Sequence, residues 1–90
     1  MPYIKGIDRY RFWNHGLFDL SMEIADKGIS NGDLNYLFSI LSKMYIDKHG
    51  LSYNTGSDVV KALECAKLEF YRRVMAPYED KAIERNGDVY

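Results

Sequence analysis

Apolar residues recur at steps of three and four along most of the chain, which is the pattern of amphipathic helices. A first helix is predicted from about Asp8 to Lys27, because Gly28 suits the left-handed position that follows a helix end. Gly16 lies inside this segment and costs roughly 1 kcal/mol relative to Ala, so we expect a kink or break there. The apolar stripe of this helix consists of Tyr10, Trp13, Leu17, Leu20 and Ile24.

A second helix is predicted to begin at Asn31 or Gly32 and to end at His49, where another glycine follows. Ser30 and Asp33 have the spacing of a capping box, although Asp is shorter than the preferred Glu. The apolar face of this helix consists of Leu34, Leu37, Phe38, Leu41, Met44 and Tyr45.

A third helix is predicted after the turn-rich residues 52–56, with Thr55 and Asp58 at the spacing of a helix cap. It should end near Ala76, because Pro77 lacks a backbone N–H and disfavours helical conformation at the preceding residue. Proline also suits the first turn of a helix, so a short fourth helix is predicted from Pro77 to Arg85.

No segment shows the alternation of a strand, and the 90 residues have the length of one small domain. We therefore expect a single all-α domain over residues 1–90, built as a small three-helix bundle with a short fourth C-terminal helix after Pro77. Its principal core should contain Trp13, Leu17, Leu20, Leu37, Leu41, Leu63, Ala66 and Phe70.

The third helix carries more apolar residues than one core needs. Its main face consists of Val59, Ala62, Leu63, Ala66, Phe70 and Val74. A second apolar line consists of Val60, Leu68, Tyr71 and Met75, interrupted by Glu64 and Lys67, and in the first helix Phe12, Phe18 and Met22 also point away from the main stripe. Such surplus predicts a homo-oligomer, most simply a dimer, with the second line at the interface. Alternatively, the fourth helix and the N-terminal segment cover these residues within one monomer.

The amino-acid composition excludes some classes of protein function. Hydrophobic residues make up 47% of the chain, charged residues 28%, and the formal net charge is -1, which excludes a disordered chain and a polycation that binds nucleic acid in bulk. The lone Cys65 cannot form an internal disulfide, so a reducing compartment is the simpler assignment. With no apolar run of signal or membrane-span length, we expect a cytosolic protein without a membrane partner.

One acidic line in the first helix has the spacing of a possible metal site. His15, Asp19 and Glu23 follow at steps of four, and Asp26 lies three further on. The spacing lacks the two-helix closure of di-metal bundles, so a solvated acidic stripe with one His-Asp hydrogen bond is the favoured interpretation, and no metal is predicted.

A cluster of cations and tyrosines near the C-terminus is the candidate ligand site. Arginine forks bind phosphate or carboxylate in a bidentate way, and tyrosine rings can stack on a base, so a nucleotide could bind here. Arg73 is expected beside Phe70, at the edge of the core, where it would need a partner. The alternative is pairing of both arginines with Glu69 along the helix. The candidate ligand residues are Lys67, Tyr71, Arg72, Arg73 and Tyr78.

Enzyme classes find little support in the sequence. Cys65 lies within a helix with no activating base placed nearby, which favours a packing role over that of a nucleophile. The chain has no nucleophile elbow, phosphate-binding loop or dinucleotide fingerprint. Its acids also lack the Glu-x-x-Glu and Glu-x-x-Asp arrangement of all-helical nucleotide pyrophosphohydrolases. We therefore expect a non-enzymatic protein without a cofactor.

Several short blocks of sequence resemble a family of small uncharacterised proteins from phages, prophages and scattered microbial genomes. The blocks are ALECAKLEFYRRV (residues 62–74), PYED (77–80), NGDVY (86–90), the opening MPYI and DLNYL (33–37). The resemblance implies a small accessory protein, plausibly viral, with its function in the C-terminal block.

Two hypotheses follow from these observations. In the first, a helical homo-oligomer binds or sequesters a small anionic, nucleotide-like ligand, for instance a signal used in host defence, where the protein would act as an antagonist. In the second, the spare apolar helix face docks a host or phage partner, and the chain is a protein-interaction module or inhibitor.

Overall fold

The computed structural model describes residues 4–90, so Met1–Tyr3, part of the MPYI block, lie outside the described residues. The described part is helical and contains no strand, which confirms the all-α class. Two units divide the chain, Met1–Met44 and Tyr45–Tyr90. The single domain and the bundle arrangement remain predictions. Within residues 4–90 no helix is long and apolar enough to cross a membrane.

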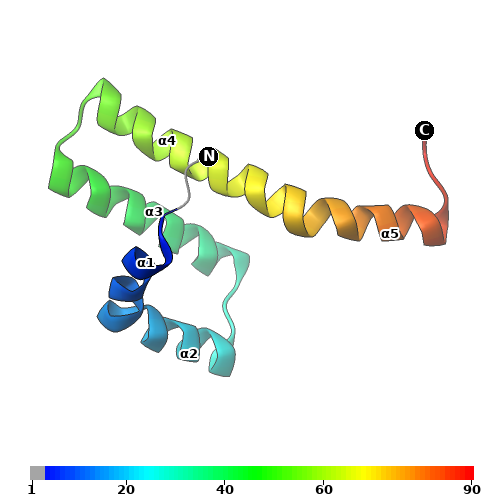
Figure 1. Ribbon diagram of the computed structural model, residues 1–90, viewed down its shortest axis with the longest axis horizontal. Helices are drawn as coiled ribbons and strands as arrows, with labels where there is room; N and C mark the ends of the chain where they lie inside the picture. Colours follow the sequence, from blue (N-terminus) through cyan, green and yellow to red (C-terminus); the bar gives the residue numbers. More distant parts are fainter. Residues whose placement is uncertain (1–3) are drawn as a thin grey trace. The chain divides into compact units, whose positions relative to one another are not determined.

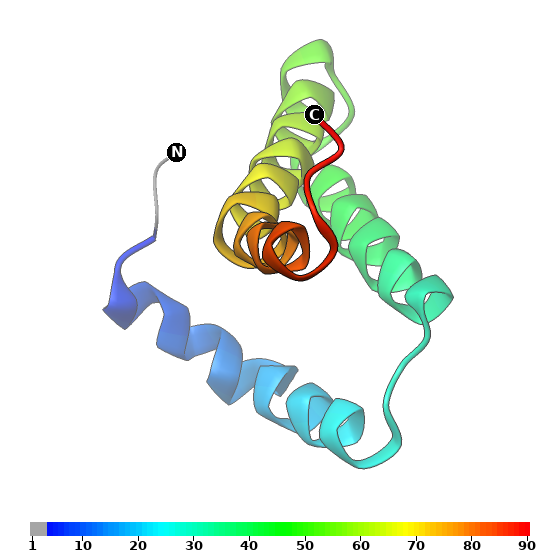
Figure 2. The same cartoon turned by 90° about the vertical axis from the view of Figure 1, so that its right-hand side faces the viewer.

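The first unit opens with a helix that is broken in its middle. Figure 2 shows α1 (Gly6–Phe12), η1 (Trp13–Leu17) and α2 (Phe18–Lys27) as consecutive segments of one ribbon, blue to light blue. The backbone leaves helical conformation at His15 (φ -124°, ψ 40°) and at Gly16 (φ 110°). A φ of 110° is open to glycine and strained for other residues. The predicted break at Gly16 is thus confirmed.

α3 (Asn31–His49) has the boundaries that the sequence predicts. The Asp33 N–H donates to Ser30 Oγ at 3.0 Å, and the Ser30 N–H donates to Asp33 Oδ2 at 3.0 Å. These reciprocal bonds satisfy two donors that the helix start would leave without intrahelical partners, so the shorter Asp side chain still completes a capping box. Gly50 follows the last residue with φ 79°.

In the second unit, α4 (Tyr53–Phe70) starts earlier than predicted. Ser52, not Thr55, is the N-cap: the Thr55 N–H donates to Ser52 Oγ at 3.1 Å, and the Ser52 N–H donates to Thr55 Oγ1 at 2.9 Å. The expected cap of Thr55 with Asp58 is therefore wrong, because Thr55 already serves Ser52. Asp58 instead accepts a 3.0 Å hydrogen bond from the Tyr45 hydroxyl.

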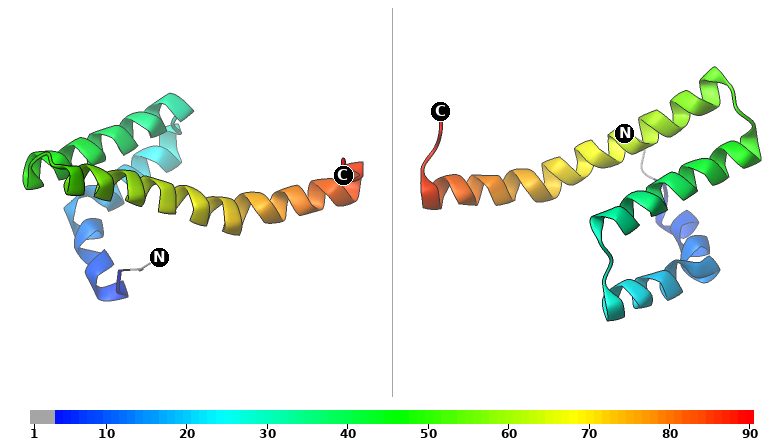
Figure 3. Two further views of the ribbon diagram at one scale, coloured as in Figure 1. Left: turned by 90° about the horizontal axis from the view of Figure 1, so that it is seen from above. Right: turned by 180° about the vertical axis from the view of Figure 1, so that it is seen from behind.

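Pro77 does not separate two helices. α4 continues through η2 (Tyr71–Met75) into α5 (Ala76–Asn86), and Figures 1 and 3 show one uninterrupted ribbon from green to red. The residues that flank η2, Phe70 and Ala76, both keep right-handed helical dihedral angles. The predicted helix end at Ala76 is wrong, and a separate fourth helix is not confirmed.

The proline is accommodated by a change of hydrogen-bond register. Pro77 cannot donate the α-type bond to the carbonyl of Arg73, because it has no N–H. The N–H of Ala76, the residue immediately before Pro77, donates to the Tyr71 carbonyl, five residues back, so η2 is a π turn. A π turn inserts one extra residue without ending the helix.

The predicted core is not confirmed: within residues 4–90 no side chain is buried. Trp13 is 45% exposed, Leu41 62% and Phe70 57%, and only Leu37 of the eight predicted core residues is half-buried. Helical periodicity identifies the apolar faces of a helix but not what covers them. The other predicted core residues, all exposed, are Leu17, Leu20, Leu63 and Ala66.

Candidate functional site on the C-terminal helix

The two arginines of the candidate ligand site meet one carboxylate. Arg72 Nη2 lies 2.7 Å from Glu69 Oε1, and Arg73 Nη1 lies 3.6 Å from the same oxygen. Their side chains are 70% and 66% exposed, whereas the Glu69 side chain is only 23% exposed. The intrahelical pairing that the sequence suggested is present. The expected place of Arg73 at a core edge is not confirmed, since Arg73 and Phe70 are both exposed.

The remaining candidate ligand residues lie along the same stretch of helix. Lys67 Nζ lies 3.4 Å from Glu64 Oε1, three residues earlier, and the Tyr71 hydroxyl donates to Glu79 Oε2 at 2.8 Å. Tyr78 is 61% exposed. The five residues thus lie on one continuous stretch of helix, and Lys67 and Tyr71 are each bonded to an acid of their own chain.

The hydrogen bond to Glu79 changes the acidity of Tyr71. It holds the pKa of the phenol above its ordinary value of 10.0, chiefly because the bond stabilises the protonated form, with a further contribution from the negative charge of Glu79 itself. The pKa of the Tyr45 phenol is raised in the same way by its hydrogen bond to Asp58. Both phenols therefore stay protonated at neutral pH and act as donors.

The Tyr71–Glu79 bond joins residues eight positions apart, which an ordinary α-helix would place about 80° apart around its axis. The extra residue of η2 reduces the effective separation to seven positions, which is about two turns and brings both residues onto one line. The bond therefore spans the π turn and links the residues before it to those after it on one face of the helix.

The same rotation extends the second apolar line beyond Pro77. At about 100° per residue, and counting η2 as one surplus residue, Ile83 lies within about 50° of the line that holds Val60, Leu68, Tyr71 and Met75. We name these five residues the apolar stripe. Val60 is 67% exposed, Leu68 57%, Tyr71 49% and Ile83 42%, and Met75 is half-buried.

Sequence reasoning missed Ile83 because it treated Pro77 as a helix end. The proline itself was the available signal, since a proline inside a helix requires a kink or a π turn. Cys65 lies half-buried on α4 with a free thiol, in keeping with a packing position.

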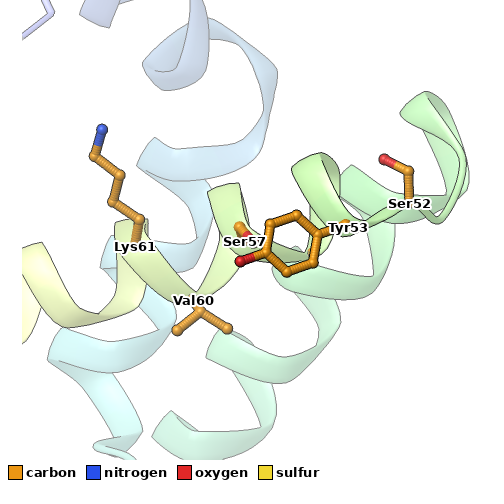
Figure 4. Close-up of a pocket in the computed structure, with 6 residues that line it drawn as sticks. Ser52, Tyr53, Ser57, Val60 and Lys61 are labelled. Carbon is orange, nitrogen blue, oxygen red and sulfur yellow. The ribbon is translucent and has the colours of Figure 1, made fainter.

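An open hollow continues the apolar stripe at the start of α4. It has a volume of about 520 Å³ and lies within residues 52–61 (Figure 4). Val60, a member of the stripe, lines it together with Tyr53 and Lys61. The hollow is thus one end of the same face of the helix.

The acidic line of the first unit does not assemble into a site. Non-helical dihedral angles at His15 interrupt the step of four to Asp19, and Glu23 pairs with Lys27 at 3.2 Å. The His15 Nδ1 instead contacts the Arg11 carbonyl. Among residues 4–90 no group of three or more His, Cys, Asp or Glu side chains is placed to hold a metal ion.

Comparison with known proteins gives a family and no further relatives. Neither the curated proteins nor the solved structures yield a match. One family model, described as a domain of unknown function, DUF6899, matches residues 1–89. This match covers nearly the whole chain, including the C-terminal helix described above, and the chain therefore belongs to the DUF6899 family.

Proposed function

We propose that this chain is a non-enzymatic cytoplasmic protein that works by self-association of its helices, as a homo-oligomer. The resemblance of its C-terminal blocks to phage and prophage proteins supports a role as a phage accessory protein. The bundle that the sequence predicts within one chain is then completed between copies, where the exposed helix faces meet.

The observation that carries the proposal is the exposure of large apolar side chains on two faces of α4–η2–α5. Phe70, Tyr71 and Tyr78 are 57%, 49% and 61% exposed. At roughly 200 Å² for each ring, these three alone leave about 330 Å² of mainly apolar surface in water. The largest apolar patch on a monomer is of about this size and is often functional, so these exposed rings are candidates for an interaction surface.

Sedimentation equilibrium over a range of concentrations tests this proposal. We expect the mass to rise from the 10.5 kDa of one chain to about twice that value or more as concentration increases. A mass of 10.5 kDa at every concentration would contradict self-association. In that case we would propose instead that the exposed apolar faces bind a different protein.

A second candidate function, binding of a small anionic ligand such as a nucleotide, is favoured by the charge balance at Glu69. Two guanidinium groups share one carboxylate oxygen, and both are more than 60% exposed. An incoming phosphate could engage either planar fork in a bidentate way, with Tyr71 or Tyr78 beside it. Because both guanidinium groups are exposed, a ligand could reach them while Glu69 keeps its place on the helix.

Thermal shift across a panel of nucleotides tests the second candidate. Stabilisation follows RT ln(1 + [L]/Kd), which is about 2.7 kcal/mol at a hundredfold excess over Kd. Arg73→Lys keeps the charge and loses the planar fork, so it should abolish the shift while leaving the unfolding temperature without ligand unchanged. An equal shift in the parent and in Arg73→Lys would place the ligand elsewhere.

A further inference from the structure

We propose that a second copy of this chain packs antiparallel along the apolar stripe, with a twofold axis passing beside Tyr71. This arrangement rests on the proposed self-association and specifies its partner, its face and its direction. Three observations on α4–η2–α5 support it: the order of residues along the stripe, the distribution of charge beside it, and the hollow at its end.

The residues along the stripe read the same in both directions. In chain order they are Val60, Glu64, Leu68, Tyr71, Met75, Glu79 and Ile83. With η2 counted as one surplus residue, the steps are four, four, three, three, four and four positions. A twofold interface brings each residue i against j and each j against i, so an antiparallel helix pair requires such a symmetric order.

In this arrangement Tyr71 meets its own counterpart, and the apolar residues pair across the axis. Val60 faces Ile83 of the other copy and Leu68 faces Met75, because each pair lies at equal distances on either side of Tyr71. Figure 4 shows Val60 and Tyr53 at the hollow. In the proposed arrangement the other copy's Ile83 packs into this hollow.

Charges beside the stripe complement each other in the antiparallel direction. Lys61 and Lys67 lie on the N-terminal half, whereas Glu79 and Asp80 lie on the C-terminal half. At 1.5 Å per residue, Lys61 of one copy lies about 3 Å along the axis from Asp80 of the other, on the same flank. Lys67 similarly comes within about 4.5 Å, measured along the axis, of the other copy's Glu79.

A parallel pair would place Glu79 and Asp80 beside the same two acids of the other copy, which is unfavourable. In the antiparallel pair Glu64 of one copy lies opposite Glu79 of the other, and Lys67, which pairs with Glu64 at 3.4 Å, lies beside both acids. Glu79 also accepts a hydrogen bond from the Tyr71 hydroxyl of its own chain at 2.8 Å. Because Lys61 and Lys67 approach the other copy's acids only in the antiparallel pair, the charges favour that direction.

The stripe is also long enough to form an interface. From Val60 to Ile83 it runs about 33 Å at 1.5 Å per residue, and a contact one helix wide covers roughly 400 Å² per copy. Standard interfaces bury about 800 Å² per partner, and smaller ones are weak. We therefore expect dissociation in the micromolar range unless further surfaces add to the contact.

Disulfide trapping tests the arrangement. In a Cys65→Ser background, Val60→Cys and Ile83→Cys are placed in separate chains, mixed and oxidised, and the covalent dimers are quantified. Ala62→Cys with Lys81→Cys is the matched control, because these positions lie at equal distances from Tyr71 on the opposite face of the helix. Circular dichroism checks that each variant stays helical.

We expect the Val60→Cys and Ile83→Cys mixture to form the mixed disulfide at least fivefold faster than the control pair. Each variant alone should form little, since its two copies lie about 33 Å apart. Efficient Val60→Cys homodimers would overturn the antiparallel direction, and cross-linking no faster than the control would overturn the stripe as the interface. If sedimentation still gives an oligomer, self-association itself survives either result, whereas a monomer at all concentrations overturns both proposals.

Discussion

Two residues that disfavour helices, Gly16 in the first unit and Pro77 in the second, have opposite effects on the helices that contain them. At Gly16 the backbone turns to φ 110° and the helix breaks. Before Pro77 the helix adopts a π turn and continues to Asn86. A glycine permits a conformation that stops a helix, whereas a proline removes one donor that a register change can replace.

The break at Gly16 and the π turn before Pro77 also have different effects on how apolar residues line up along their helices. The break at Gly16 ends the regular alignment of the residues before it with those after it. The π turn rotates α5 by about one residue and thereby aligns Ile83 with Leu68 and Tyr71. The second unit therefore offers one long continuous face, which is why we assign self-association to it.

The largest expected effect comes from a charge on that face. Leu68→Asp should raise the dissociation constant of the oligomer at least about 100-fold, because each copy would bury an unpaired carboxylate. The matched control is Phe18→Asp in the first unit, since Phe18 is 58% exposed and Leu68 57%. Sedimentation equilibrium measures both variants, and equal effects would remove the distinction between the two units.

Pro77→Ala tests whether the π turn aligns the face. The restored N–H can donate to the Arg73 carbonyl, so the helix should become regular and more stable on heating. Ile83 would then rotate by about 100°, to about 120° from Tyr71, and we expect about tenfold weaker self-association. Thermal unfolding measures the change in helix stability, and sedimentation measures the change in self-association. Unchanged association with a more stable helix would contradict the proposed role of the π turn.

Gly16→Ala should act in the opposite direction on stability. An Ala Cβ at this position meets no other atom within 4 Å, so the cost arises from the backbone alone. Because Ala is strained at φ 110°, the substitution should lower the free energy of unfolding by about 1 kcal/mol or more. Chemical denaturation measures this loss. If Gly16→Ala instead stabilises the chain, the first helix runs straight and the comparison with Pro77 fails.

The smallest expected effect is the pH dependence of the Tyr71–Glu79 bond. Because this bond raises the pKa of the Tyr71 phenol in the folded state, its contribution to stability is complete below pH 10.0. The contribution should be lost as pH rises from 10.0 through the raised pKa. Tyr71→Phe should lose the Tyr71 part of this alkaline dependence and keep the part that Tyr45 contributes, whereas Tyr53→Phe, at an 89% exposed position, should keep both. Denaturation between pH 9 and 12 provides the comparison.

Local capping and stop signals predicted much of the secondary structure. The Ser30–Asp33 capping box and Gly50 fixed both ends of α3, and the break at Gly16 occurred where expected. These features depend on neighbours within a few residues, so the sequence contains their cause. The cap of α4 was wrong by three residues because Ser52 and Asp58 offered Thr55 two competing partners.

The core and the surroundings of Arg73 could not be predicted in the same way. Burial depends on contacts between distant parts of the chain or between copies, and helical periodicity does not specify them. The pairs of Glu69 with Arg72 and Arg73 were predictable from spacing alone, because residues three and four apart are neighbours on any helix.

Hydrogen exchange of the unmodified protein, at concentrations above and below the association midpoint, tests most directly whether the second unit is the interface. Helical amides stay protected only where packing holds the helix closed. We predict slow exchange for residues 60–83 that becomes faster on dilution, together with faster, concentration-independent exchange for residues 6–17. Exchange of residues 60–83 that is as fast as that of residues 6–17 at every concentration would contradict self-association through this helix.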